Sequence, residues 1–228
     1  MIADPRKFYI GVGLLAFFAV VLVILFLPVL DGQNAMTYLD SLYNSISKQS
    51  AYHISQLKEE AAGQRAAELR LDLAMENSAA AEEAAAILAA GGLTARAAGD
   101  GIELRGDLPR LLTACLDDSD LMFANDGEAL EAKYGLDGKK ALFRWWQVLK
   151  QVDKGLNRES RFDDAKLVGA VKKKGLEAAY NYYGIEPIHI RDKLGAVILS
   201  LAFYVLYTVW YGYAIIFIFE GCGLKLSH

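Results

Sequence analysis

The sequence GAVILSLAFYVLYTVWYGYAIIFIF, residues 195–219, contains no charged side chain in twenty-five consecutive positions. As an α-helix it would extend about 37 Å, which exceeds the roughly 30 Å hydrocarbon core of a lipid bilayer. Residues 8–30 form a second uncharged run near the other end of the sequence. The two runs predict two transmembrane helices, with the residues between them attached to a bilayer at both ends.

The charged residues separate these runs from the segment between them. Only three of the 24 basic and two of the 28 acidic residues lie outside residues 31–194, so that segment carries a formal charge of −5. Its 164 residues are enough to bury a core without disulfides or metal ions. Its mild acidity argues against nucleic acid as a partner, because phosphate binding requires a basic surface.

Residues 8–30 are interpreted as an uncleaved signal anchor. Arg6 and Lys7 precede the run, as in the basic region of a signal sequence. The run is longer than the roughly 7–15 apolar residues of a cleavable signal, and no small-residue cleavage site follows it. Gly11 and Gly13 place small side chains in its first half, where another helix could approach closely.

The basic residues that flank the two runs predict their orientation. Arg6, Lys7 and Lys225 lie at the outer ends of the runs, whereas Arg191 and Lys193 precede the second run on the other side. Loops rich in Lys and Arg remain in the cytoplasm. We therefore expect both termini, residues 1–7 and 220–228, in the cytoplasm of a bacterial inner (plasma) membrane, and residues 31–194 in the periplasm.

Hydrophobic periodicity divides the middle of the chain into three parts. Residues 31–64 show helical spacing and predict one long membrane-proximal helix, with Asn34 as its N-cap and Gly63 as its end. Residues 65–123 predict a β-α-β-β-α unit, with strands at 68–75, 93–98 and 102–105. Ser78 is the predicted cap of the first helix and Asp107 of the second, and residues 99–101 form a hairpin turn.

Residues 124–194 predict a helical subdomain. Its expected helices cover residues 128–134, 139–154 and 163–183, and each is expected to close at a glycine, Gly135, Gly155 or Gly184. The predicted fold class is therefore a mainly α membrane protein, with two transmembrane helices flanking an α+β domain. The small unit resembles many α+β regulatory folds in its order of elements, which carries no function.

Residues that could carry chemistry are few. Asp117, Asp118 and Asp120 form the densest acidic group, but their spacing does not match a calcium-binding loop, so we interpret them as a solvated helix end. Cys115 lies in an apolar helical pattern typical of a core residue, and Cys222 follows the second run. No cofactor or metal is predicted.

The remaining motifs point the same way. The three histidines, His53, His189 and His228, lie outside both runs, and no CxxCH haem attachment motif is present. The sequence also lacks GxSxG, P-loop and GxGxxG signatures.

Aromatic residues give the clearest candidates for a binding face. Two adjacent helical positions cannot both face one core, so of the pair at 145 and 146 we assign Trp146 to a partner or the membrane surface. In the second run Tyr204, Tyr207, Trp210 and Tyr211 reach its middle, where lipid offers no hydrogen-bond partner. Together with Gly11 and Gly13 they predict a helix-packing face, which is favoured over a pocket for a quinone or lipid.

The leading hypothesis is a non-enzymatic accessory or scaffolding subunit that presents residues 31–194 to a larger membrane complex. The expected partners are the bilayer and another integral membrane protein or further copies of this chain. The hypothesis depends on the missing catalytic motifs, the aromatic residues within the second run and the shortness of residues 220–228. Two alternatives remain open: a small-ligand sensor that signals through a partner, and an enzyme with a site at the membrane surface around residues 117–126.

Overall fold

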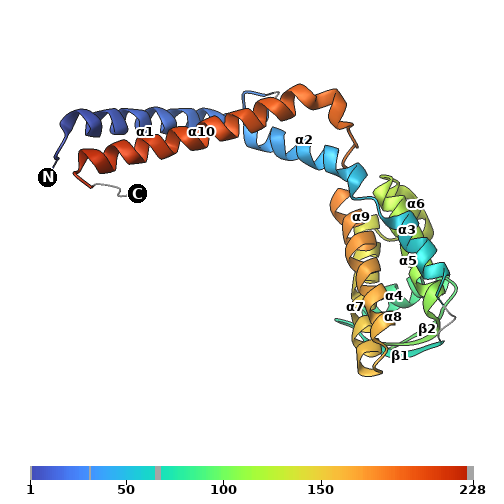
Figure 1. Ribbon diagram of the computed structural model, residues 1–228. Helices are drawn as coiled ribbons and strands as arrows, with labels where there is room; N and C mark the ends of the chain where they lie inside the picture. Colours follow the sequence, from blue (N-terminus) through green and yellow to red (C-terminus); the bar gives the residue numbers. More distant parts are fainter. Residues whose placement is uncertain (1, 31, 65–67, 225–228) are drawn as a thin grey trace. The chain divides into compact units, whose positions relative to one another are not determined.

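The computed structural model describes residues 2–30, 32–64 and 68–224, and within them the chain is mostly helical with a small three-stranded sheet (Figure 1). Lys225 and His228 lie outside the described residues. The chain divides into two compact units. The terminal unit comprises Met1–Ser47 and Pro187–His228, and the central unit comprises Lys48–Glu186.

The terminal unit is built on two long apolar helices, α1 (Pro5–Phe26) and α10 (Leu194–Gly221). A short 3₁₀ helix, η2 (Ile190–Lys193), precedes α10. By length and composition both apolar helices could cross a membrane. Helix α1 ends before Pro28, since the residue before a proline disfavours helical backbone. The predicted run at residues 8–30 is therefore helical only as far as Phe26.

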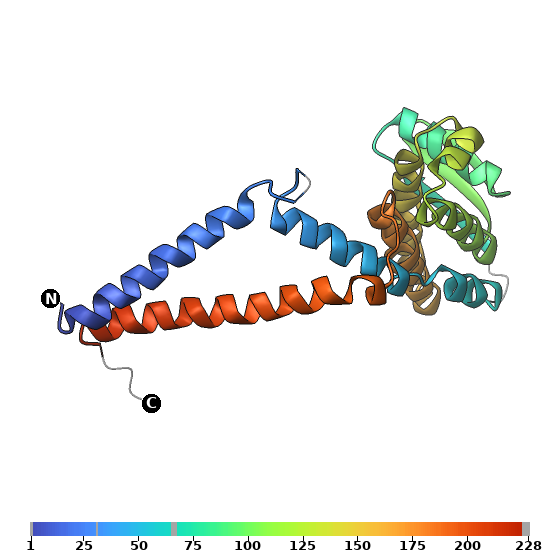
Figure 2. The ribbon, with the colours of Figure 1, turned by 90° about the horizontal axis from the view of Figure 1, so that it is seen from above.

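Where α1 begins and α10 ends, the two helices lie side by side (Figure 2). A Cβ atom at Gly11 would lie 2.7 Å from the backbone nitrogen of Ile218, so this position requires a glycine for the close approach. Lys7 Nζ and Glu220 Oε2 are 2.6 Å apart, and the backbone N–H groups of Ala3 and Asp4 donate to the carbonyl of Gly221. Glu220 is thus ion-paired with Lys7.

Residues 31–64 do not form one helix. They form α2 (Ala35–Ser50), which Asn34 caps as predicted, and α3 (Ile54–Ala62). Tyr52 lies in the interruption, where its ring packs edge-on against Phe123 and its hydroxyl donates to Asp120 at 2.9 Å. These contacts are with a distant part of the chain, and they interrupt the helix at a point where the hydrophobic spacing of the sequence continues.

The central unit contains the predicted β-α-β-β-α order. Its elements are β1 (Glu68–Ala74), α4 (Ser78–Ala90), β2 (Thr94–Ala98), β3 (Gly101–Asp107) and α5 (Leu108–Phe123). Strand β3 lies in the middle and pairs antiparallel with both neighbours. Asp107 caps α5 as predicted, but α4 is capped by Asn77, one residue before the predicted Ser78.

One face of the sheet is apolar and the other is charged. Leu69, Leu73, Ile102 and Leu104 are buried on the inner face, because alternate residues of paired strands point to the same side. Helices α4 and α5 contact the strands, and a third helix, α7, also packs on β1.

Four further helical segments and a π-helix complete the central unit. They are α6 (Gly127–Tyr134), α7 (Gly138–Arg158), α8 (Phe162–Ala170), the π-helix η1 (Val171–Leu176) and α9 (Glu177–Tyr182). Gly135, with φ of +66°, ends α6 as predicted. Gly155 does not end α7. Its missing side chain makes room for Leu71 of β1, since a Cβ atom at Gly155 would lie 2.7 Å from Leu71 Cδ2. The single helix predicted for residues 163–183 is interrupted by η1.

Candidate functional site

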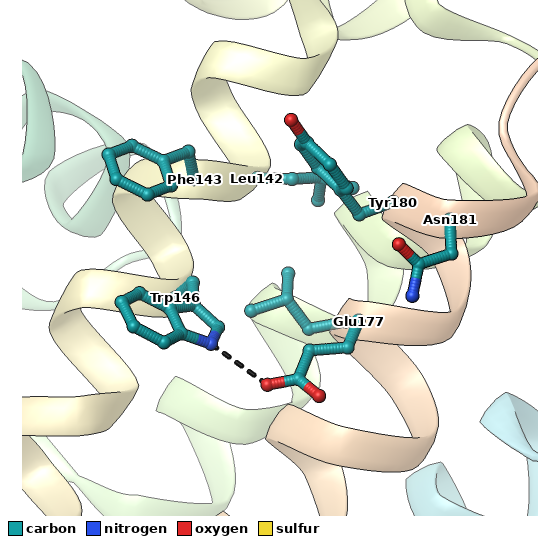
Figure 3. Close-up of a pocket in the computed structure, with 7 residues that line it drawn as sticks. Leu142, Phe143, Trp146, Glu177, Tyr180 and Asn181 are labelled. Atoms are coloured by element: carbon teal, nitrogen blue, oxygen red, sulfur yellow. Dashed lines mark hydrogen bonds between the residues drawn. The ribbon is translucent and has the colours of Figure 1, made fainter.

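An aromatic groove lies on the central unit between α7 on one side and η1 with α9 on the other (Figure 3). Its volume is about 360 Å³. Both walls present apolar and aromatic side chains, with one carboxylate and one amide between them. The residues that line it are Leu142, Phe143, Trp146, Leu176, Glu177, Tyr180 and Asn181.

The two adjacent tryptophans of α7 take different positions, as successive helical residues must. Trp145 is fully buried in the core, whereas Trp146 is half-buried and forms part of the groove wall. The Trp146 indole N–H donates to Glu177 Oε1 at 2.9 Å, and its ring is stacked with that of Phe143 at a centroid distance of 6.0 Å. Trp146 is therefore held in place by both walls.

The rim of the groove is exposed and carries cations. Phe143 and Tyr180 are each 40% exposed, which is high for large aromatic side chains. The ammonium of Lys150 lies 4.9 Å from the centre of the Trp146 ring, and that of Lys139 lies 5.4 Å from the Tyr180 ring. Aromatic residues in a preformed concavity with a polar rim are typical of the centre of a protein–protein interface.

The π-helix contributes to the shape of this groove. It supplies Leu176 to the wall and directly precedes Glu177. Single π-turns within α-helices are frequent at functional sites, because the wider turn moves the following side chains out of α-helical register. The sequence carries no local signal for η1, so this feature was missing from the sequence-based prediction.

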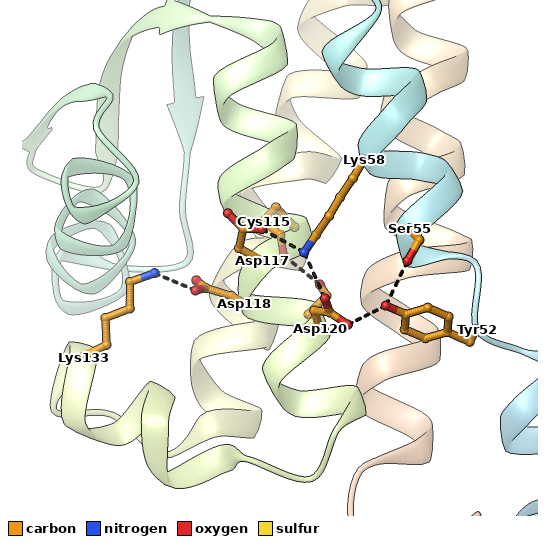
Figure 4. A network of polar contacts seen from close by, with 9 residues as sticks. Tyr52, Ser55, Lys58, Cys115, Asp117, Asp118, Asp120 and Lys133 are labelled. Carbon is orange, nitrogen blue, oxygen red and sulfur yellow. Dashed lines mark hydrogen bonds and ion pairs between the residues drawn. The ribbon is translucent and has the colours of Figure 1, made fainter.

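The aspartates of α5 do not form one site (Figure 4). Asp118 is fully buried, which makes the expectation of a solvated helix end wrong for this residue. Its carboxylate accepts hydrogen bonds from Lys133 at 2.7 Å, Tyr134 at 2.6 Å and Trp145 at 2.7 Å. Burial raises the pKa of the Tyr134 hydroxyl, and the hydrogen bond from that hydroxyl to Asp118 raises it further.

Asp117 and Asp120 face a different partner. Both carboxylates lie 2.9 Å from Lys58 Nζ, and this pairing joins α5 to α3. In the described ranges 2–30, 32–64 and 68–224 no group of three or more His, Cys, Asp or Glu side chains could hold a metal ion. The arrangement of these three aspartates ties helices together.

The cysteines occupy contrasting environments. Cys115 is fully buried in the core, as predicted, and burial raises the pKa of its thiol far above the ordinary value. Cys222 is exposed at the end of α10.

The predicted packing face of the terminal unit is only partly brought together. Tyr204, Tyr207 and Tyr211 line an apolar cavity of about 580 Å³ between α1, α2 and α10. Trp210 packs instead against Phe17 of α1, with ring centres 4.9 Å apart.

The two glycines of α1 also differ in whether they contact α10. Gly11 lies against α10, whereas a Cβ at Gly13 would meet nothing within 4 Å. The role of these residues and of Trp146 in binding a partner remains a prediction.

Comparison of the chain with protein-family models, with curated proteins and with solved structures finds no match.

Proposed function

We propose that this chain is a two-pass membrane protein that serves as an accessory subunit and binds a partner protein through the aromatic groove of its central unit. The observation that carries the membrane part is the exposure of α1 and α10. In each helix only 6% of the most apolar 18-residue stretch is buried within the structure. A core helix of a water-soluble protein would be mostly buried, and so large an apolar surface requires hydrocarbon or protein around it.

The proposed topology follows the basic residues. Arg6 and Lys7 lie in the first turn of α1, which favours cytoplasmic termini in an inner membrane and a periplasmic central unit. The ion pair between Lys7 and Glu220 supports a common depth for the outer ends of both helices, because such a pair belongs at the headgroup level rather than in hydrocarbon.

The groove supports a protein partner. Its stacked Phe143 and Trp146 and the exposed Tyr180 offer a concave apolar surface in which an apolar side chain of a partner fits. Lys139 and Lys150 lie over the aromatic rings at either side, so acidic residues flanking that anchor would complement the rim. An extramembrane segment of another integral membrane protein is the proposed partner.

A gentle-detergent pull-down of the full-length chain tests the proposal. The membrane fraction is solubilised, and mass spectrometry quantifies what is recovered with the wild-type chain and with a Phe143→Ser/Tyr180→Ser variant. Phe162→Ser is the matched control, since Phe162 is 63% exposed on the same unit but outside the groove.

A stoichiometric membrane partner that is lost with the groove variant and kept with the control supports the accessory role. Recovery of the chain alone, or only of further copies of itself, contradicts it. Recovery of the chain in the soluble fraction without detergent contradicts the membrane location.

The volume of the groove also favours a second candidate function. Sites for small molecules occupy about 300–1,000 Å³, and the groove, at about 360 Å³, falls in that range. A small-ligand sensor would show a saturable rise in melting temperature with one compound of a screen, and this rise would be absent in the Phe143→Ser/Tyr180→Ser variant.

A further inference from the structure

The cavity of the terminal unit is separate from the aromatic groove and has no role in the function proposed above. It lies where α1 and α10 diverge and α2 begins (Figure 2). Its walls consist of side chains from all three helices, among them Phe18 and Leu22 of α1, Met36 and Leu39 of α2, and Leu201 of α10. The cavity volume is about 580 Å³.

Aromatic residues close the cavity at one end. The ring of Phe18 is stacked on Tyr207 with centres 4.2 Å apart, and it packs on Tyr211 at 5.1 Å. Beyond this cluster Gly11 lets α1 and α10 come into backbone contact, so no space continues in that direction. A ligand must therefore enter from the α2 end or from the side.

Three of the six hydroxyl groups among the described residues of the wall are hydrogen-bonded within the protein. The hydroxyls of Tyr43 and Ser200 are hydrogen-bonded to each other at 2.6 Å, and Thr208 Oγ1 donates to the Tyr204 carbonyl at 2.7 Å. The Tyr207 hydroxyl is buried and has no hydrogen-bond partner among the residues that the structure describes. No charged side chain belongs to the described residues that line the cavity. The wall thus selects for hydrocarbon and offers little to a polar headgroup.

The dimensions of the cavity suit a hydrocarbon chain. From Ser200 to Tyr211 the wall of α10 extends about 16 Å at 1.5 Å per residue. The cavity volume of about 580 Å³ lies within the roughly 300–1,000 Å³ of sites for small molecules, and an acyl chain is a ligand of that class.

From these observations we propose that the cavity binds one acyl chain of a phospholipid. The ester end of the chain lies near Tyr43 and Ser200, and its methyl end lies against Phe18. Helix α2 supports this direction, because it carries apolar Met36 and Leu39 towards the cavity and polar Asp40 beside them, as a helix at a membrane interface does. The bound chain fills the space between diverging helices that would otherwise be void.

This inference rests on the membrane location given under Proposed function, and the experiment separates the two. The full-length chain is extracted from membranes with a mild detergent, washed extensively and analysed by native mass spectrometry with quantification of the lipid retained. The variants Leu201→Trp and Leu39→Trp each place a large ring in the cavity from a different helix. Leu206→Trp is the matched control, because Leu206 is 69% exposed on α10 and lies outside the cavity.

We expect about one phospholipid per wild-type chain and per Leu206→Trp chain, and at least a fivefold loss in the two cavity variants. Absence of lipid from the wild type, retention of an isoprenoid lipid in its place, or equal retention in all variants would overturn the inference and leave the membrane location intact. A chain that stays soluble without detergent would instead contradict the membrane location itself.

A phospholipid with a diazirine at the methyl end of one acyl chain gives an independent measurement. It is expected to label peptides that contain Phe18 or Tyr211. Labelling confined to the outward-facing side chains of α10, such as Leu206, would place the chain outside the cavity and contradict the proposal.

Discussion

The indole N–H of Trp145 donates to the carboxylate of Asp118 at 2.7 Å, and both side chains are fully buried. This bond joins α7 to α5 in the middle of the core. With Lys133 and Tyr134 the carboxylate has three donors, as a buried charge requires.

Asp118→Asn is expected to destabilise the chain by about 3 kcal/mol. The substitution keeps the shape of the side chain but removes the charge opposite Lys133 and leaves an amide N–H facing donors. Urea unfolding followed by tryptophan fluorescence measures the change. Asp117→Asn is the control: Asp117 is 57% exposed and should cost less than about 1 kcal/mol. Equal stability of the two variants would contradict the structural role given to Asp118.

Glu83 should make stability depend on acidic pH. Burial opposes ionisation of its carboxyl, but hydrogen bonds from Lys140 and Arg144 outweigh burial and lower its pKa below the ordinary 4.5. A lowered pKa means that the native state holds the proton less tightly than the unfolded state. The contribution of Glu83 is therefore complete above pH 4.5 and is lost as the pH falls below it.

The Glu83→Gln variant tests this. At pH 7 we expect it to be less stable by about 1 kcal/mol, a value reduced for the partial exposure of these side chains, and the difference should shrink as the pH falls below 4.5. The neighbouring and exposed Glu82 supplies the control, Glu82→Gln, which should show no such deficit. A deficit of the Glu83 variant that does not change with acidification would argue against the ion pair as its cause.

The two cysteines should differ sharply towards thiol reagents. Cys115 is fully buried and its pKa is raised, so thiolate is scarce and inaccessible, whereas Cys222 is exposed. A maleimide is expected to label one site per native chain and none in a Cys222→Ser variant until denaturant is added. With a membrane-impermeant maleimide, labelling of inverted but not of right-side-out vesicles is expected if the termini are cytoplasmic; the reverse would invert the proposed topology.

Gly11 and Gly13 form a matched pair for testing how α1 packs. Gly11→Leu should force α1 and α10 apart and destabilise the chain by about 2 kcal/mol, because the new side chain meets the backbone of α10. Gly13→Leu has open space and should change stability by less than about 0.5 kcal/mol. Thermal unfolding in detergent measures both, and similar losses for the two variants would contradict the packing of α1 on α10.

Local signals predicted much of the fold correctly. Helices α1 and α10 follow from uncharged runs, and the β-α-β-β-α order follows from the change of hydrophobic period at residue 68. Asp107 begins α5 as its N-cap, and Gly135 ends α6 in a left-handed backbone conformation. All these signals operate over a few residues, which is why they can be read without knowing the tertiary structure.

Tertiary contacts decided the remainder. Gly155 looks like a helix stop but makes room for Leu71, which lies 84 positions earlier in the chain. Distant residues also decide the environment of Tyr52 and Asp118. The partners of Tyr52 on α5 break a predicted helix, and the burial of Asp118 depends on donors from α6 and α7. The walls of the groove and of the cavity likewise come from helices far apart in sequence. By itself the sequence determined most of the helices, strands and apolar runs, because those properties are local. Which side chains meet, and what space they leave between them, depends on long-range packing.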